Sequence, residues 1–216
     1  MKKIFLTLVC ILCTLTVSAQ YAGESASFFS AQRSEQPVTW GIRGGVNFSK
    51  MTMSSDGYSL SPSNNIGYNV GICVDIPMLE SLYLQSGLYW TVKGYKMEDG
   101  GEKVTATPSY LEIPILASYR YYFSDYTHLQ INFGPYFAYG VAGKYKWEYD
   151  GEKADEDFFG DGIKRFDAGF AMGAGMTFGH IFVGFNYDLG LANLLEDSDG
   201  VSWKNRTFSI NLGYNF

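Results

Sequence analysis

The last eleven residues of the chain alternate strictly between apolar and polar side chains. The apolar positions are Phe208, Ile210, Leu212, Tyr214 and Phe216. A period of two predicts a strand with one apolar face. No lysine, proline or glycine pair follows Phe208 to blunt the open edge of this strand. We therefore expect it to pair with a distant strand and to close a ring against the first strand of the domain.

The same alternation predicts seven further strands. They are expected at about residues 40–49, 68–76, 82–93, 110–122, 129–141, 166–178 and 181–189. Pro114 and Pro135 conflict with two of these strands, because proline removes a hydrogen-bond donor from the ladder. We expect a bulge or a local gap in the pairing at these positions.

The connections between the predicted strands alternate in length. Long polar segments at residues 50–65, 95–108, 143–164 and 192–205 alternate with short connections. Transmembrane barrels have this asymmetry, with short periplasmic turns and longer extracellular loops. A soluble sandwich or a lipocalin-like barrel, whose apolar face points inward, is the alternative. The small residues of the polar face fit a narrow interior, whereas eight strands could not enclose the aromatic and aliphatic face. The predicted fold class is therefore all-β, an eight-stranded antiparallel up-and-down transmembrane β-barrel in the bacterial outer membrane.

The first residues have the pattern of a secretory signal peptide. Lys2 and Lys3 precede an apolar run from residue 4 to 17, and Val17-Ser18-Ala19 provides a small-residue cleavage site. A membrane anchor is the alternative, but the run is shorter than the about 20 residues that span a bilayer as a helix. We predict a signal peptide at 1–19, a flexible periplasmic lead-in at 20–37 and the barrel domain at 38–216.

Composition and charge narrow the class further. Aromatic residues make up 17% of the chain and there are 25 glycines, which favours β-structure with close backbone approaches. Cleavage would leave Cys73 as the single cysteine, so no internal disulfide is expected. Removing Lys2 and Lys3 leaves 14 basic against 22 acidic residues, a net charge of −8. An acidic exported chain is a poor candidate for binding nucleic acid.

Charged side chains on the polar faces are the first candidate site. The predicted inward-facing charges are Arg43, Asp75, Glu112, Arg120, Asp167 and Asp188. In a narrow lumen these charges must pair, because each unpaired buried ion costs several kcal/mol. We expect a structural network of ion pairs in a lumen filled by side chains. A proton or ion relay is the alternative.

The two long loops at residues 143–164 and 192–205 are the second candidate site. Acidic residues gather at 155–161 and 196–199, but neither group has the full spacing of an EF-hand loop. We interpret the acidic residues as solvated loop charge, with cation binding as the alternative. Nearby aromatic side chains are expected to be exposed and to contact a sugar or a partner, or to lie at the membrane rim. The predicted loop contacts are Trp147, Asp155, Asp157, Phe158, Phe159, Asp197, Asp199 and Trp203.

Catalysis has little support in the sequence. The chain has two histidines, His128 and His180, and neither is spaced from a Ser or Cys in a recognisable catalytic pattern. We expect no enzyme activity, no cofactor and no metal.

Four motifs resemble those of the PorT-like small outer-membrane β-barrel family of Bacteroidetes-type bacteria. They are residues 110–116 (YLEIPIL), 165–175 (RFDAGFAMGAG), 187–191 (YDLGL) and 213–216 (GYNF). The resemblance covers most of residues 38–216 and implies barrel construction rather than an activity. It also implies that a proline is tolerated at position 114. Some members of the family are linked to protein secretion, but the resemblance implies no catalytic residues.

The expected role is that of a small integral outer-membrane barrel with a structural or binding function through its extracellular loops. The alternative is a component of a secretion or transport complex in the outer membrane. The expected partners are outer-membrane lipid and an envelope protein or glycan at the loops. The aromatic C-terminus at Phe216 resembles the signal that barrel-assembly machinery recognises, so this machinery is an expected partner during insertion.

Overall fold

The computed structural model describes residues 36–55, 58–60, 63–99, 102–149, 152–160, 162–196 and 200–216. The predicted signal peptide and almost all of the predicted lead-in lie outside these residues, as do Asp161, Asp197 and Asp199. Within the described residues, no helix is long and apolar enough to cross a membrane.

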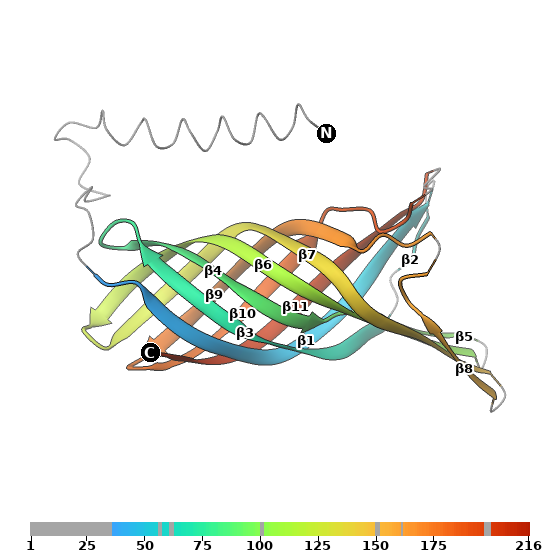
Figure 1. Cartoon of the computed structure of the whole chain (residues 1–216), viewed down its shortest axis with the longest axis horizontal. Coiled ribbons are helices and arrows are strands. Elements are labelled where there is room, and N and C mark those ends of the chain that lie inside the picture. The colour runs from blue at the N-terminus through green and yellow to red at the C-terminus, as the bar shows by residue number, and fades with distance from the viewer. Residues whose placement is uncertain are drawn as a thin grey trace.

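The described chain forms one antiparallel sheet that closes on itself (Figure 1). Its strands are β1 (Thr39–Ser55), β2 (Tyr58–Leu60), β3 (Ser63–Pro77), β4 (Leu82–Val92), β5 (Tyr95–Asp99), β6 (Glu102–Ser124), β7 (Thr127–Tyr149), β8 (Glu152–Asp157), β9 (Phe166–Phe178), β10 (Ile181–Gly190) and β11 (Ser202–Asn215). Eight of them form a ring in the order β1-β3-β4-β6-β7-β9-β10-β11, and β11 pairs with β1 from Gly41↔Asn215 to Ser54↔Ser202. The prediction of an eight-stranded barrel closed by the last strand is confirmed.

The stagger of the strands sets the width of the barrel. Paired residues can be followed once around the ring from Arg120 through Gln130, Gly175, Gly184, Asn211, Gly45, Asn69 and Thr91. The path returns to β6 at Tyr110, ten residues from its start. A barrel of eight strands is just wide enough for side chains to fill it. The interior therefore admits only a few large side chains at each level.

Alternation along the strands separates an apolar outer face from a polar interior. On β6 the outward Leu111, Ile113 and Ile115 are exposed, whereas the intervening Glu112, Pro114 and Leu116 are buried. The other strands of the ring repeat this pattern, with outward Leu212 61% and Ile66 70% exposed. An exposed band of this size that surrounds the molecule is incompatible with water and fits the hydrocarbon of a bilayer.

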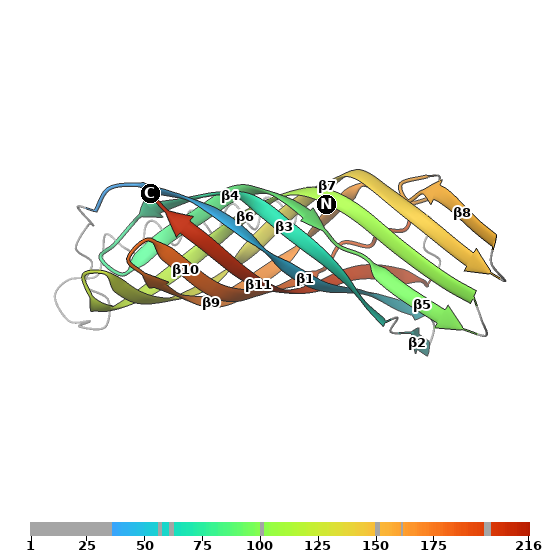
Figure 2. The same ribbon diagram turned by 90° about the horizontal axis from the view of Figure 1, so that it is seen from below.

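The two ends of the barrel differ. One end carries the short turns between β3 and β4, β6 and β7, and β9 and β10, together with the C-terminus (Figures 1 and 2). At the other end, β6 and β7 continue beyond the ring and pair with β5 and β8. The expectation of irregular polar loops at 95–108 and 143–164 is therefore wrong in part, because both segments contain paired strands.

Pro114 in β6 and Pro135 in β7 are accommodated without a bulge. Pairing of β4 with β6 stops at Ser86↔Ile115 and resumes at Tyr89↔Glu112 in the same register, leaving a gap opposite Pro114. The Ser86 hydroxyl donates a hydrogen bond of 2.8 Å to the Pro114 carbonyl oxygen across this gap. The register shifts that do occur in β6 lie between Ser109 and Tyr110 and between Tyr122 and Ser124.

Candidate functional site inside the barrel

All six charged residues predicted to face the lumen are buried inside the barrel. Their exposed fractions range from 0% for Asp167 to 8% for Glu112. The structure divides them between two clusters. Arg43, Asp75 and Arg120 belong to the short-turn end, and Glu112, Asp167 and Asp188 belong to the long-loop end.

The cluster at the short-turn end is built around one ion pair. Arg120 Nη2 lies 2.6 Å from Asp75 Oδ2, and Gln85 Nε2 donates to Asp75 Oδ1 at 2.7 Å. The Arg120 guanidinium also stacks over the Tyr83 ring at 4.0 Å. The ion-pair contact, the hydrogen bond from Gln85 and the ring face of Tyr83 compensate the burial of this pair. The arrangement fills part of the lumen near the turns with buried side chains.

Arg43 belongs to the same end but has a different environment. Its Nη1 donates to Asn215 Oδ1 at 2.7 Å, and its guanidinium lies 4.0 Å from the centre of the Phe182 ring. Among the described residues it forms no ion pair with a carboxylate, and its Nη2 has no hydrogen-bond partner. The expectation that every charge in the lumen is paired with an opposite charge therefore does not hold for Arg43.

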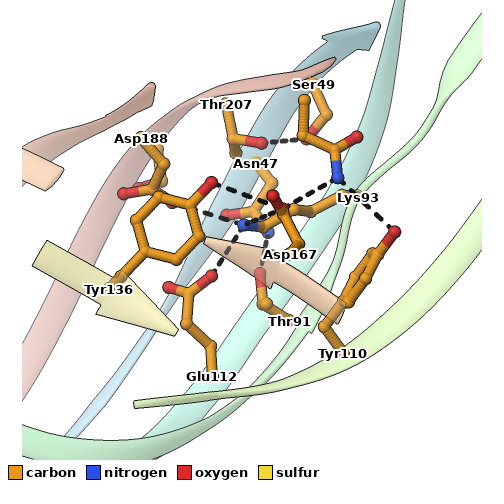
Figure 3. Close-up of polar contacts among 12 residues, drawn as sticks. Asn47, Ser49, Thr91, Lys93, Tyr110, Glu112, Tyr136, Asp167, Asp188 and Thr207 are labelled. Carbon is orange, nitrogen blue, oxygen red and sulfur yellow. Dashed lines mark hydrogen bonds and ion pairs between the residues drawn. The ribbon is translucent and has the colours of Figure 1, made fainter. Parts of the chain in front are cut away.

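The cluster at the long-loop end has Lys93 at its centre, a residue that was not among the predicted site residues. Lys93 Nζ lies 2.6 Å from Glu112 Oε2, 3.8 Å from Asp167 Oδ2 and 4.0 Å from Asp188 Oδ2 (Figure 3). Its side chain is completely buried. Lys93 directly follows the last residue of β4 and has the same parity as the buried Thr91. This parity in the sequence could have indicated that Lys93 faces the lumen.

Aromatic and amide side chains complete the Lys93 cluster. The Lys93 ammonium lies 4.4 Å from the centre of the Tyr136 ring and 5.7 Å from that of Tyr110. The Tyr136 hydroxyl donates to Asp167 Oδ2 at 3.3 Å, and Asn205 Nδ2 donates to the same oxygen at 2.9 Å. One ammonium thus holds three carboxylates, and neighbouring donors share the remaining negative charge.

A polar cavity separates the two clusters. It has a volume of about 80 Å³ and is lined by both Arg43 and Asp188. Most of the other lining groups are amides and hydroxyls, including those of Asn47, Asn69 and Ser209. Such a cavity has room for several water molecules. The lumen therefore contains two clusters of buried side chains with a polar cavity between them.

Phe158 and Phe159 close the long-loop end of the interior. The expectation that they are exposed loop aromatics is wrong, because they are only 1% and 9% exposed. Their rings meet edge to face at 5.0 Å, and Phe159 packs against Tyr110 at 5.6 Å. A side chain at Gly140 would collide with the Phe159 ring. The loop turns these aromatics inward because the mouth of the barrel offers them an apolar surface.

The other predicted loop contacts remain near the surface. Trp147 is 50% exposed, whereas Trp203 is half-buried and packs against the cluster of buried side chains at the mouth. Asp155 and Asp157 are exposed, and Asp155 Oδ2 lies 3.7 Å from Lys144 Nζ. Within the described residues, no three His, Cys, Asp or Glu side chains are placed to hold a metal ion. Asp197 and Asp199 are outside the part of the chain that the structure describes.

Several solved outer-membrane proteins are similar in structure. Ail, the attachment invasion locus protein of Yersinia pestis, is 18% identical with a TM-score of 0.43, over 84% of this chain and 100% of Ail. OprG of Pseudomonas aeruginosa is 12% identical with a TM-score of 0.47, over 86% of this chain and 97% of OprG. Neisserial surface protein A is 10% identical with a TM-score of 0.40, over 83% of this chain and 98% of that protein. No curated protein sequence is significantly similar to the chain.

Residues 29–196 match the family model described as the outer membrane protein beta-barrel domain. The match covers more than half of the 216 residues and agrees with the closed ring and its apolar outer band. The chain is therefore a member of the outer membrane protein beta-barrel domain family and a small β-barrel protein of the bacterial outer membrane.

Proposed function

We propose that this protein binds a partner at the cell surface through the sheet that projects from its long-loop end. Outer-membrane barrels carry their short turns on the periplasmic side, so the long-loop end is extracellular. The observation that carries the proposal is the length of β6 and β7, which have 23 residues each. A strand needs only about 9–11 residues to span the membrane. The rest of each strand contributes to an extracellular structure.

The projecting sheet has the order β5-β6-β7-β8 (Figure 2). Among the described residues β8 pairs only with β7, so its outer edge has free backbone donors and acceptors. Trp147 is half-exposed on β7, and exposed aromatic side chains are common anchors in interfaces. These features suit an envelope protein or a glycan as the partner.

The interior supports a role as an anchor rather than as an open pore. The Lys93 cluster and Phe159 lie at the extracellular end of the lumen, and the Arg120–Asp75 pair lies at the periplasmic end, which supports a lumen blocked by side chains. A non-catalytic role is part of the proposal. The proposal also includes membership of the PorT-like family, which the motifs at residues 110–116 and 165–175 support. Insertion would depend on assembly machinery that reads the terminal Phe216.

The test removes the projecting hairpins and leaves the ring intact. One variant replaces residues 145–156 with an Asn-Gly turn, which keeps the Lys144↔Asp157 pair. A matched variant replaces residues 96–105 and keeps the Tyr95↔Ala106 pair. The proteins are folded in nanodiscs and screened against a glycan array and against purified envelope proteins.

We expect the wild-type protein to bind a member of these panels and the first variant to lose that binding while it still migrates as a folded barrel on unheated gels. The matched variant shows whether the β5–β6 hairpin contributes. Equal binding by the wild-type protein and both variants would refute the proposal. If the wild-type protein and both variants bind a component of a secretion system equally strongly, the result would favour the alternative that the protein belongs to a secretion complex.

A further inference from the structure

Three basic side chains lie together on the outer face of the seam where the barrel closes. Lys50 on β1 is directly paired with Arg206 on β11, and Lys204 is paired with Thr52 two residues further along. The register of the seam is unbroken from Gly41 to Ser54, so these side chains share the parity of the outward Val46 and Phe208. We call Lys50, Lys204 and Arg206 the seam cations.

The seam cations have no negative partner among the described residues. None of them takes part in an ion pair there, and the residue paired with Arg206 on its other side is Leu189. Arg206 Nε is buried and has no hydrogen-bond partner. By contrast, Lys144 in the projecting sheet lies 3.7 Å from an aspartate.

This arrangement is expected to destabilise the pairing of β1 with β11. Like charges directly opposite each other on neighbouring strands are destabilising. The chain as a whole is acidic, with 22 Asp and Glu against 16 Lys and Arg, so carboxylates were available in quantity. A cluster of cations at the closing seam without a carboxylate partner among the described residues therefore favours a negative group from outside the chain, which would offset the repulsion.

The position of the seam cations indicates where that group lies. The next outward pair toward the membrane is Phe48↔Phe208, whose ring centroids are 6.4 Å apart. Phe208 also packs against Phe185 at 6.3 Å, and both belong to the exposed apolar band. Aromatic side chains mark the edge of the hydrocarbon in transmembrane barrels. The seam cations thus lie just extracellular of this edge, at the level of the lipid headgroups.

We propose that the seam cations form a binding site for the phosphate groups of an anionic lipid in the outer leaflet. Arg206 and Lys50 contact phosphate from both sides of the seam, and Lys204 adds a third positive charge. The apolar surface formed by Phe48, Phe185 and Phe208 receives the acyl chains below the headgroup. A bound lipid would then stabilise the seam.

The test compares lipid binding by full-length protein in nanodiscs of phosphatidylcholine that contain either phosphorylated or dephosphorylated lipid A. Retained lipid is measured by native mass spectrometry. We expect retention of phosphorylated lipid A by the wild-type protein, with about fivefold weaker binding for each of Lys50→Gln and Arg206→Gln. Lys144→Gln removes the same charge from the projecting sheet and is expected to bind as the wild-type protein does.

A second measurement distinguishes a lipid-binding role of the seam cations from a purely structural role. In phosphatidylcholine alone, Lys50→Gln relieves the repulsion with Arg206 and should leave the unfolding midpoint unchanged or raise it. With phosphorylated lipid A the same variant should unfold earlier than the wild-type protein. Equal retention of both forms of lipid A, or retention unaffected by the two substitutions, would overturn the proposal. Displacement of the lipid by inorganic phosphate at a similar concentration would overturn the assignment to a lipid.

Discussion

Replacing Lys93 with methionine should destabilise the barrel more than any other change of a single charge. Methionine keeps most of the length of the side chain and removes the ammonium that holds Glu112, Asp167 and Asp188. Breaking a buried ion pair by removing one partner costs about 3–5 kcal/mol. Lys93 is completely buried and faces three carboxylates, so the upper part of this range applies. Typical total stabilities are only about 5–15 kcal/mol.

The free energy of unfolding can be measured by urea titration of protein folded into lipid vesicles. Lys144→Gln is the matched control, because Lys144 is 65% exposed and its pair with Asp155 is open to solvent. An exposed pair contributes about 0–1 kcal/mol. In the Lys93→Met background, adding Glu112→Gln should recover part of the loss, because one buried carboxylate is then neutral. A loss for Lys93→Met no larger than that for Lys144→Gln would refute the view that the carboxylates depend on Lys93.

Four further predictions test the barrel and its closure. Ile210→Arg places a charge on the apolar band, where Ile210 is 52% exposed, and should cost about 2–4 kcal/mol in vesicles, whereas Ile210→Val should cost little. Gly140→Leu should displace Phe159 from the mouth, which trypsin cleavage after Lys164 or Arg165 would detect as faster than in the wild-type protein. Wild-type protein in planar bilayers should carry no steady open-pore current, and such a current would contradict the closed lumen. Phe216→Asp should reduce recovery of folded protein from the outer-membrane fraction, since Phe216 is 69% exposed at the apolar rim, whereas Phe216→Tyr should not.

The projecting hairpins show where the alternation of apolar and polar residues stops being informative. Inside the membrane, one face of each strand meets lipid and the other meets the lumen, so the side chains must alternate. Beyond the membrane both faces of a strand contact water, and charged residues occur at both parities in the extension of β6, at Glu102 and Lys103, and in β8, at Glu156 and Asp157. The same composition is typical of loops. For this reason residues 102–103 and 152–157 could not be recognised as parts of strands, whereas the alternation of residues 144–149 (KYKWEY) was a usable signal for the extension of β7.

The burial of Phe158 and Phe159 could not be read from the sequence either. They lie between two acidic groups in a segment without a period, and such aromatics are as compatible with a membrane rim or a binding surface as with burial. What buries them is the mouth of the barrel, which is formed by Tyr110, Gly140 and Gly143. Pairing at Tyr110↔Gly140 brings two of these residues together.

The sequence by itself determined the class of barrel, the outward face of each transmembrane strand and the charged residues that face the lumen. These properties follow from a period of two, which each strand expresses locally. Only the tertiary structure decided which lumen charges meet, because that depends on the stagger accumulated around the ring. The ten-residue stagger brings Lys93, which follows β4, beside carboxylates of β6, β9 and β10. The same closure places Lys50 opposite Arg206, a contact between residues at the two ends of the domain that no local pattern contains.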